Sequence, residues 1–374
     1  MRHYGIVGCG ICVVRRESIV YAKGFGCAEL PTTPFLVTTA TRCGSLAKPV
    51  TALAALILAD QGKLDLDAEV LPILKELRVT PRPVGGSRMD ERISRITIRH
   101  LMDHTSGLPN GTTYTAWRPG LNVAARQNLE HVATGADVVA DALGNARLDS
   151  DPGAKYQYAN ANFVILARVI EGRSHMPFNK FLTEVAMPRF GLAPDEVYVS
   201  QNQLAPDSPQ RGKNEAAYYQ TSKDRFVSFV PAEQAQGKIY GEAYRGYTTD
   251  ASDGGGGIAC TATALGKIVA NLHSEKPALS KRALTEILTP PSHYTRQRDF
   301  RPAGSTFYSK GFNVVFSGGQ PWFGHSGMTQ HCGGIIGHQA GYQYIAVSNW
   351  NNADKPYVDV ILGRALNDTL GRLG

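Results

Sequence analysis

The fold is decided by the stretch Gly44-Ser45-Leu46-Ala47-Lys48-Pro49-Val50-Thr51-Ala52-Leu53-Ala54-Ala55-Leu56. Its Ala- and Leu-rich composition strongly favours a helix. This helix is apolar on nearly every side, as expected of one in the centre of a protein. Ser45 and Lys48 are three residues apart and share one face near its start. Burying a lysine without a partner is costly, which favours an amine that acts on the serine.

An ordinary helix start explains the same four residues. In that interpretation Ser45 caps the helix and Lys48 is a surface residue of the first turn. Short motifs match often by chance, so the pattern taken alone favours this interpretation. The choice between the two depends on the rest of the chain.

The composition is that of a globular protein. The 374 residues are 43% hydrophobic and 19% charged, enough to bury a large core in one large domain or two intertwined ones. The formal charge is +7, but the basic residues are scattered. They lack the clustered stripe with aromatics that is typical of nucleic-acid binding, so we expect no nucleic-acid partner.

The six cysteines predict free thiols rather than a disulfide framework. Cys9 and Cys12 lie on an expected strand, where positions three apart point to opposite faces, so they do not suggest a metal or redox site. No apolar run approaches the roughly 20 residues needed to span a bilayer. No secretory signal opens the chain. We expect a cytoplasmic protein, or a secreted or periplasmic one if a leader has been removed.

Strands are expected at both ends of the chain, with helices and loops between them. The expected strands are 5–14, 19–26, 309–316, 322–327, 333–338 and 342–349. The expected helices run from Thr97 to a stop at Gly107, over 137–143, over 164–172 with Asn160 or Asn162 as cap, over 178–187 closed by Pro188, over 261–272 with Thr261 or Thr263 as cap, and from Lys355 to about Leu373.

This order predicts an α+β fold, in which an antiparallel sheet is flanked by helices. Residues 1–75 and 252–374 would form a discontinuous sheet domain, and 76–251 a helical and loop-rich lobe. The active site would lie in the cleft between them, with the polar segment 195–250 as a lid or cleft wall.

Two further stretches contain residues that could suggest a catalytic pair or a cofactor site. His104 and Ser106 lie close together at a helix stop, so we expect a buried turn that orders a neighbouring loop rather than a catalytic pair. The glycine run 254–257 does not follow a strand in a G-x-G-x-x-G frame, so no dinucleotide cofactor is expected.

Three short motifs occur in order: Ser45-Leu46-Ala47-Lys48, Tyr158-Ala159-Asn160 and His325-Ser326-Gly327. Together they resemble the penicillin-recognising serine hydrolases, which carry S-x-x-K, Y-x-N or S-x-N, and K-T-G or H-x-G. The chain looks most like the β-lactamase/transpeptidase-like branch of class C β-lactamases, DD-peptidases, D-aminopeptidases and family VIII esterases. The likeness covers nearly the whole chain.

The resemblance implies a role for each matching residue. Ser45 would be the nucleophile that forms an acyl-enzyme, and Lys48 and Tyr158 would share the acid and base work. The oxyanion hole would be the backbone N–H groups of Ser45 and Met328. Substrate would be bound by Asn160, His325, Gly327 and Met328. The implied enzyme is a serine hydrolase of small esters, amides or peptides, without cofactor or metal.

The chain departs from the family pattern twice. His325 replaces the lysine of β-lactamases, and a histidine is only partly charged at neutral pH, which weakens a carboxylate-binding point. Esterase, D-peptidase or amidase action is therefore favoured over efficient β-lactam hydrolysis. The branch usually carries a helix before the first strand, so we expect either a shortened chain or a face covered by a partner, such as a second copy in a homo-oligomer.

Three alternatives stay open. A biosynthetic acyl-transferase or peptide cyclase would use the same acyl-enzyme, and a non-catalytic sensor or scaffold would bind an acyl ligand without turnover. A metal hydrolase using His325, His331 and His338 is the weakest, because their spacing matches no ligand pattern.

Overall fold

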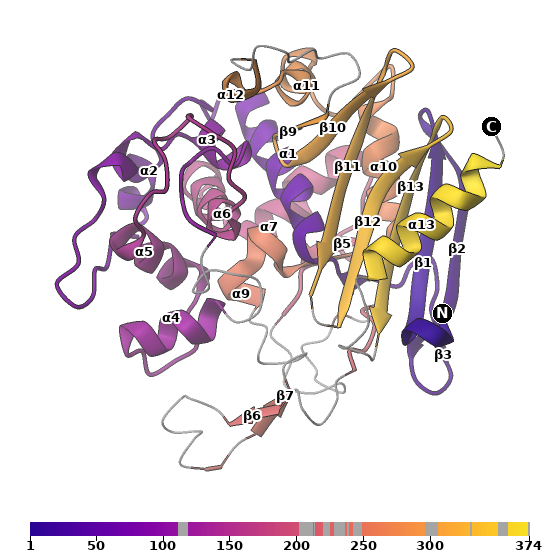
Figure 1. Cartoon of the computed structure of the whole chain (residues 1–374), viewed down its shortest axis with the longest axis horizontal. Helices are drawn as coiled ribbons and strands as arrows, with labels where there is room; N and C mark the ends of the chain where they lie inside the picture. The colour runs from indigo at the N-terminus through magenta and orange to yellow at the C-terminus, as the bar shows by residue number, and fades with distance from the viewer. Residues whose placement is uncertain are drawn as a thin grey trace.

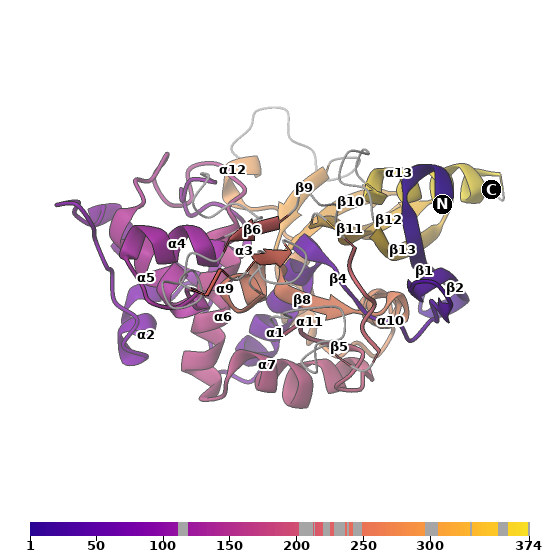
Figure 2. The same cartoon turned by 90° about the horizontal axis from the view of Figure 1, so that it is seen from below.

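The computed structural model has the predicted α+β architecture, with an antiparallel sheet and helices on both of its faces (Figures 1 and 2). It describes residues 1–110, 119–201, 212, 214–219, 225–227, 236–237, 239–241, 249–295, 306–329, 331–350 and 358–372. Most of the predicted cleft segment 195–250 lies outside these residues, so its role as lid or wall stays a prediction.

The two ends of the chain meet in one sheet of eight antiparallel strands, ordered β3-β2-β1-β13-β12-β11-β10-β9. Its strands are β1 (Ile6–Arg15), β2 (Ser18–Glu29), β3 (Thr33–Pro34), β9 (Thr306–Ser309), β10 (Phe312–Ser317), β11 (Gln320–Met328), β12 (Cys332–Gln339) and β13 (Tyr342–Trp350). Cys9 of β1 pairs with Ser348 of β13, so strands from the two ends of the sequence are neighbours in this sheet.

Two smaller sheets lie outside it. They contain β4 (Thr41–Arg42), β8 (Ile258–Cys260) and β5 (Val197–Val199), and the pair β6 (Arg225–Val227) and β7 (Ile239–Gly241).

The strand predicted over 309–316 is confirmed from Phe312 onward as β10, but its start is wrong, because the chain reverses at Lys310 and Gly311 to form the hairpin β9–β10. Both residues have a positive φ, +45° at Lys310 and +81° at Gly311. The turn is held from outside by tertiary contacts: Gly311 N–H donates to the carbonyl of Met102, and Lys310 N–H to Asp103. A local pattern does not contain these contacts.

The helical elements of the first half are η1 (Arg2–Tyr4), η2 (Gly44–Leu46), α1 (Ala47–Asp60), α2 (Val70–Glu76), η3 (Glu91–Arg95), α3 (Ile98–Met102), α4 (Pro119–Gln127), α5 (Gly135–Asn145) and α6 (Asn160–Ser174). Those of the second half are α7 (Phe178–Phe181), η4 (Leu182–Ala186), η5 (Met187–Phe190), α9 (Thr249–Ser252), η8 (Asp253–Gly257), α10 (Ala262–Leu272), α11 (Lys281–Leu288), α12 (Ser292–Thr295) and α13 (Val358–Gly371).

Two helix-cap predictions come out differently. Thr261 caps α10 as expected, since its hydroxyl accepts from Ala264 N–H. The caps proposed for α6 are wrong: Ala159 occupies the cap position without a side-chain bond, and the Asn160 and Asn162 side chains have partners elsewhere. The helix predicted to close at Pro188 instead passes into a π-helical and then a 3-10 turn, with Pro188 inside the latter.

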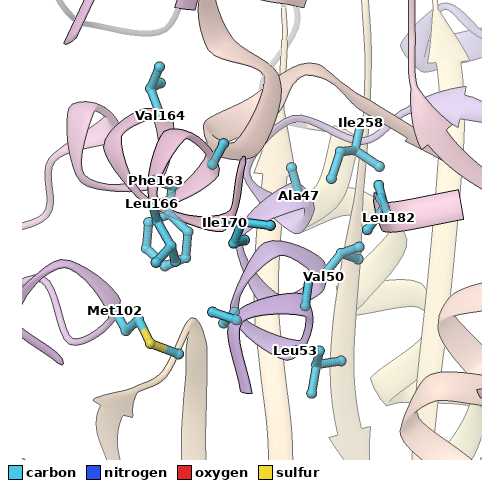
Figure 3. Packing of buried hydrophobic residues seen from close by; sticks show 14 of the residues in the cluster. Ala47, Val50, Leu53, Met102, Phe163, Val164, Leu166, Ile170, Leu182 and Ile258 are labelled. Carbon is cyan, nitrogen blue, oxygen red and sulfur yellow. The ribbon is translucent and has the colours of Figure 1, made fainter. Parts of the chain in front are cut away.

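Helix α1 forms the centre of the protein, as its all-round apolar sequence predicts. Every residue from Ala47 to Leu58 is buried. Figure 3 shows Ala47, Val50 and Leu53 of α1 beside the apolar side chains of α6. The first motif therefore lies where η2 contacts strand β11 and α1 contacts helix α6.

The sheet carries α13 on one face and α10 on the other (Figure 2). Cys9 and Cys12 point to these opposite faces, as predicted: Cys9 packs with Leu362 of α13, and the Cys12 sulfur lies against Gly266 of α10. All six cysteines are free thiols. Within the described ranges, no helix has the length and apolar character needed to cross a membrane.

The buried ion pair between Lys310 Nζ and Asp103 gives a stability prediction. Their side chains are 2% and 3% exposed, and Nζ lies 2.9 Å from both carboxylate oxygens. Asp103→Asn leaves the buried lysine with only the more distant Glu286 carboxylate, 3.9 Å away, so it should lower the free energy of unfolding by about 3 kcal/mol in urea denaturation.

The double variant Asp103→Asn/Lys310→Met removes the stranded charge and should recover much of that loss. Glu184→Gln, in the exposed pair with Lys180, is the control and should change stability by less than about 0.5 kcal/mol. Equal effects of the buried and the exposed substitution would contradict the prediction.

Candidate active site

Ser45 lies in a tight turn, η2, immediately before α1. Gly44 has a φ of +55°, and the turn packs against strand β11. Neither η2 nor α1 has a side-chain cap, and Lys48 is fully buried. The ordinary interpretation, in which Ser45 caps the helix and Lys48 is at the surface, is therefore wrong.

The buried amine of Lys48 joins three segments of the chain. Its Nζ lies 2.9 Å from Ser45 Oγ, 2.8 Å from Asn160 Oδ1 and 2.6 Å from the carbonyl oxygen of Gly255. These three partners match the three donors of an ammonium group. Removal from water disfavours the charged form and lowers the pKa of Lys48 to about 7. Near neutral pH the amine is therefore present in both protonation states.

Tyr158 approaches the same serine from the start of α6. Its hydroxyl lies 2.7 Å from Ser45 Oγ, and Lys48 Nζ lies 4.8 Å from the centre of the Tyr158 ring. Ser45 Oγ thus has two ionisable groups within hydrogen-bond distance. One of them must accept when Ser45 donates its proton, which is the arrangement an activated serine nucleophile needs.

His325 is neutral, and both of its ring nitrogens have partners within the protein. Its Nδ1 lies 2.5 Å from the carbonyl of Ser326, which can only accept, so Nδ1 carries the proton. The Tyr308 hydroxyl lies 3.2 Å from Nε2 and donates to it. Burial is the main reason why the pKa of His325 falls to about 3. The sequence predicted a partly charged histidine here, whereas the structure holds an uncharged one.

Gly327 and Met328 bring β11 against the Ser45 turn. A Cβ added to Gly327 would lie 2.1 Å from the carbonyl oxygen of Cys43 and 2.8 Å from Ser45 N. One added to Gly44 would lie 2.5 Å from Met328 N. The two backbone segments touch, and only glycine allows this approach. The N–H groups of Ser45 and Met328 belong to these two segments.

All three sequence motifs thus meet around Ser45, from η2 and α1, from the start of α6 and from β11. Sequence reasoning missed two contributors. Gly255 lies in the glycine run, which is recognisable in the sequence. It contributes its backbone carbonyl to Lys48, however, and a backbone contact is not indicated by residue type. Tyr308 lies in no motif, and the strand prediction did not separate β9 from β10.

The weak metal alternative finds no support in the part of the chain that is described. There, no three His, Cys, Asp or Glu side chains are grouped to hold a metal ion.

Comparison with known proteins assigns the family. A family model described as Beta-lactamase matches residues 1–365, so the chain belongs to the Beta-lactamase family. It is 32% identical to Esterase EstB of Burkholderia gladioli over 178 residues, 47% of this chain and 43% of that protein. It is 30% identical to Monacolin J acid methylbutanoyltransferase of Aspergillus terreus over 230 residues, 55% of this chain and 52% of that protein.

The chain spans about half the length of these curated relatives. A solved structure of D-amino acid amidase from Ochrobactrum anthropi SV3 matches with a TM-score of 0.69 at 16% identity, over 100% of this chain and 95% of that one. At this identity the likeness concerns the fold, and it confirms the predicted β-lactamase/transpeptidase-like class.

The backbone contact at Gly327 generates a prediction about the site. Gly327→Ala should push β11 away from the Ser45 turn, because the new Cβ meets backbone atoms that cannot rotate aside. We expect the rate of Ser45 labelling by a fluorophosphonate to fall by about 100-fold, as for a misplacement near 1 Å.

Gly371→Ala is the matched control, since its Cβ would meet only the end of the Gln339 side chain at 3.4 Å. Its labelling rate should equal that of the wild type. Wild-type labelling of a folded Gly327→Ala variant would show that the close contact is dispensable.

Proposed function

We propose that this protein is a serine hydrolase that forms an acyl-enzyme on Ser45 and cleaves small carboxylic esters or amide and peptide bonds. One observation carries the proposal: Ser45 Oγ lies within 2.9 Å of the Lys48 amine and 2.7 Å of the Tyr158 hydroxyl. A lysine whose pKa lies near 7 is matched to proton transfer at neutral pH.

In the proposed reaction, Lys48 or Tyr158 accepts the Ser45 proton as Oγ attacks the carbonyl carbon. The oxygen of the tetrahedral intermediate takes the negative charge, which the N–H groups of Ser45 and Met328 would stabilise. Collapse of the intermediate expels the alcohol or amine, which receives the proton, and leaves the acyl group on Ser45. Water then attacks the ester by the reverse proton path and releases the acid.

The uncharged His325 supports the choice of substrate. Its pKa near 3 leaves no positive charge at this position to bind a carboxylate. Esters and neutral amides are therefore favoured, and β-lactams, which carry a carboxylate, should be poor substrates. Asn160 holds Lys48 and is proposed to contact a substrate amide.

The proposed site lies between the two parts of the chain suggested by the sequence, residues 1–75 with 252–374 and residues 76–251. The position of α1 between sheet and helices supports this division (Figure 1). Acyl transfer to an alcohol or amine is the second candidate, favoured by the methylbutanoyltransferase activity named for the Aspergillus terreus relative. Product analysis with and without an alcohol acceptor separates the two.

The acyl-enzyme is tested by intact-mass spectrometry. A fluorophosphonate or p-nitrophenyl butyrate should add one group to the wild type and none to Ser45→Ala, because Ser45 has the adjacent amine and phenol. Ser18→Ala, at an exposed serine of β2, should react like the wild type.

An adduct without turnover would favour the non-catalytic acyl-binding alternative. No adduct from any acylating probe, and no ester hydrolysis, would contradict the proposed function.

The pH dependence tests Lys48 as the base, the first of the two acceptors named above. Below its pKa of about 7 the amine is protonated and cannot accept the Ser45 proton. The value of kcat/KM for p-nitrophenyl butyrate should therefore rise about tenfold per pH unit below 7 and level off above it. Thermal melts over the same range provide the control for unfolding. A rate that is highest near pH 5 and falls through pH 7 would show that Lys48 acts as a cation.

A further inference from the structure

His104 lies in the buried turn that the sequence suggested was only structural, yet it contacts the second motif on both sides of Tyr158. It follows α3 with a φ of +54° and is fully buried. Its carbonyl accepts from Gln157 N–H at 2.7 Å, and its Nδ1 accepts from Ala159 N–H at 3.3 Å. The residues immediately before and after Tyr158 are thus both bonded to His104.

The imidazole also packs directly on the Tyr158 ring. The two ring centres are 4.3 Å apart with an angle of 40° between the planes, closer than the 4.9 Å to Tyr308 or the 5.2 Å to Phe163. Tyr158 is therefore held by its flanking backbone and by its ring at the same time.

The protonation state of His104 is set by its neighbours. Nδ1 accepts from Ala159 N–H, and Asn162 Nδ2 lies 3.0 Å away. The Asn162 amide can donate because its oxygen accepts from Ser106 Oγ. The proton of the neutral ring must then sit on Nε2, which has no hydrogen-bond partner within the described part of the chain. Burial, with the charge of Lys48 as a smaller cause, holds the pKa of His104 well below its usual range.

We propose that His104 is a positioning residue for the acyl-transfer reaction, which holds the Tyr158 hydroxyl on Ser45 and the start of α6 on Lys48. The inference rests on the proposed function for its kinetic consequence but not for its geometry. His104 touches no reacting atom. It acts through the Tyr158 ring and through the Ala159 amide, which lies between Tyr158 and Asn160 in the chain.

Two substitutions separate the two contacts. His104→Asn keeps an acceptor near the position of Nδ1 and tolerates the positive φ, but it removes the ring. His104→Phe keeps a ring against Tyr158 and removes the acceptor. We expect His104→Asn to lower kcat for p-nitrophenyl butyrate by about 100-fold with KM nearly unchanged, since the misplaced group acts in the reaction step. His104→Phe should retain more activity per folded molecule.

Thr183→Ala is the control for a purely structural effect. Thr183 is buried and its hydroxyl donates to the carbonyl of Asn179, outside the hydrogen bonds that join Ser106, Asn162 and His104. The substitution should lower the melting temperature while leaving kcat per folded molecule unchanged. If His104→Asn behaves like Thr183→Ala, with lower stability and normal kcat, the positioning role is overturned.

A second measurement does not depend on activity. Ring-labelled tyrosine NMR, with the Tyr158 signal assigned from Tyr158→Phe, reports how freely this ring turns. In His104→Asn the Tyr158 signal should shift and sharpen as the ring begins to flip fast, whereas in Thr183→Ala it should stay as in the wild type. An unchanged Tyr158 signal in His104→Asn overturns the inference even if the protein proves to have no hydrolase activity. A changed signal in an inactive wild type supports the inference and refutes only the proposed function.

Discussion

The buried amine of Lys48 is the constraint on which the rest of the structure depends. A cation removed from water is stable only if acceptors replace its hydration, and here they come from Ser45, Asn160 and Gly255. These residues belong to η2, α6 and η8. The hydrogen bonds of one amine therefore join three separate segments at the centre of the protein. The same desolvation lowers the pKa of the amine, and it thereby links the stability of the core to the chemistry proposed for the site.

The second condition is the contact between the Ser45 turn and the sheet. Strand β11 reaches this turn because the first and last strands pair and place the C-terminal hairpins beside the N-terminal segment. Gly44 and Gly327 then allow two backbones to touch. A family site built from three distant motifs therefore needs the whole antiparallel sheet to be assembled, since no single segment contains it.

A layer of neutral, buried aromatic and histidine side chains surrounds the reacting groups. Tyr308 donates a hydrogen bond to the uncharged His325, and His104 packs on Tyr158. In the proposed function, this layer would face the substrate. Because His325 is uncharged, we propose that a substrate would be recognised by shape and hydrogen bonds rather than through a carboxylate.

The sequence by itself determined the fold class, the burial of α1, the opposite faces of Cys9 and Cys12, and the three motifs, because periodicity and residue type are local properties. Only the tertiary structure decided the hairpin at Lys310, the use of Asn160 as a partner of Lys48 rather than a helix cap, and the contact of His104 with Tyr158. Each of these depends on partners more than 50 residues away. The sequence of the turn at His104 is compatible with ordering a loop and with holding Tyr158. Only the packing of distant segments distinguishes these two roles.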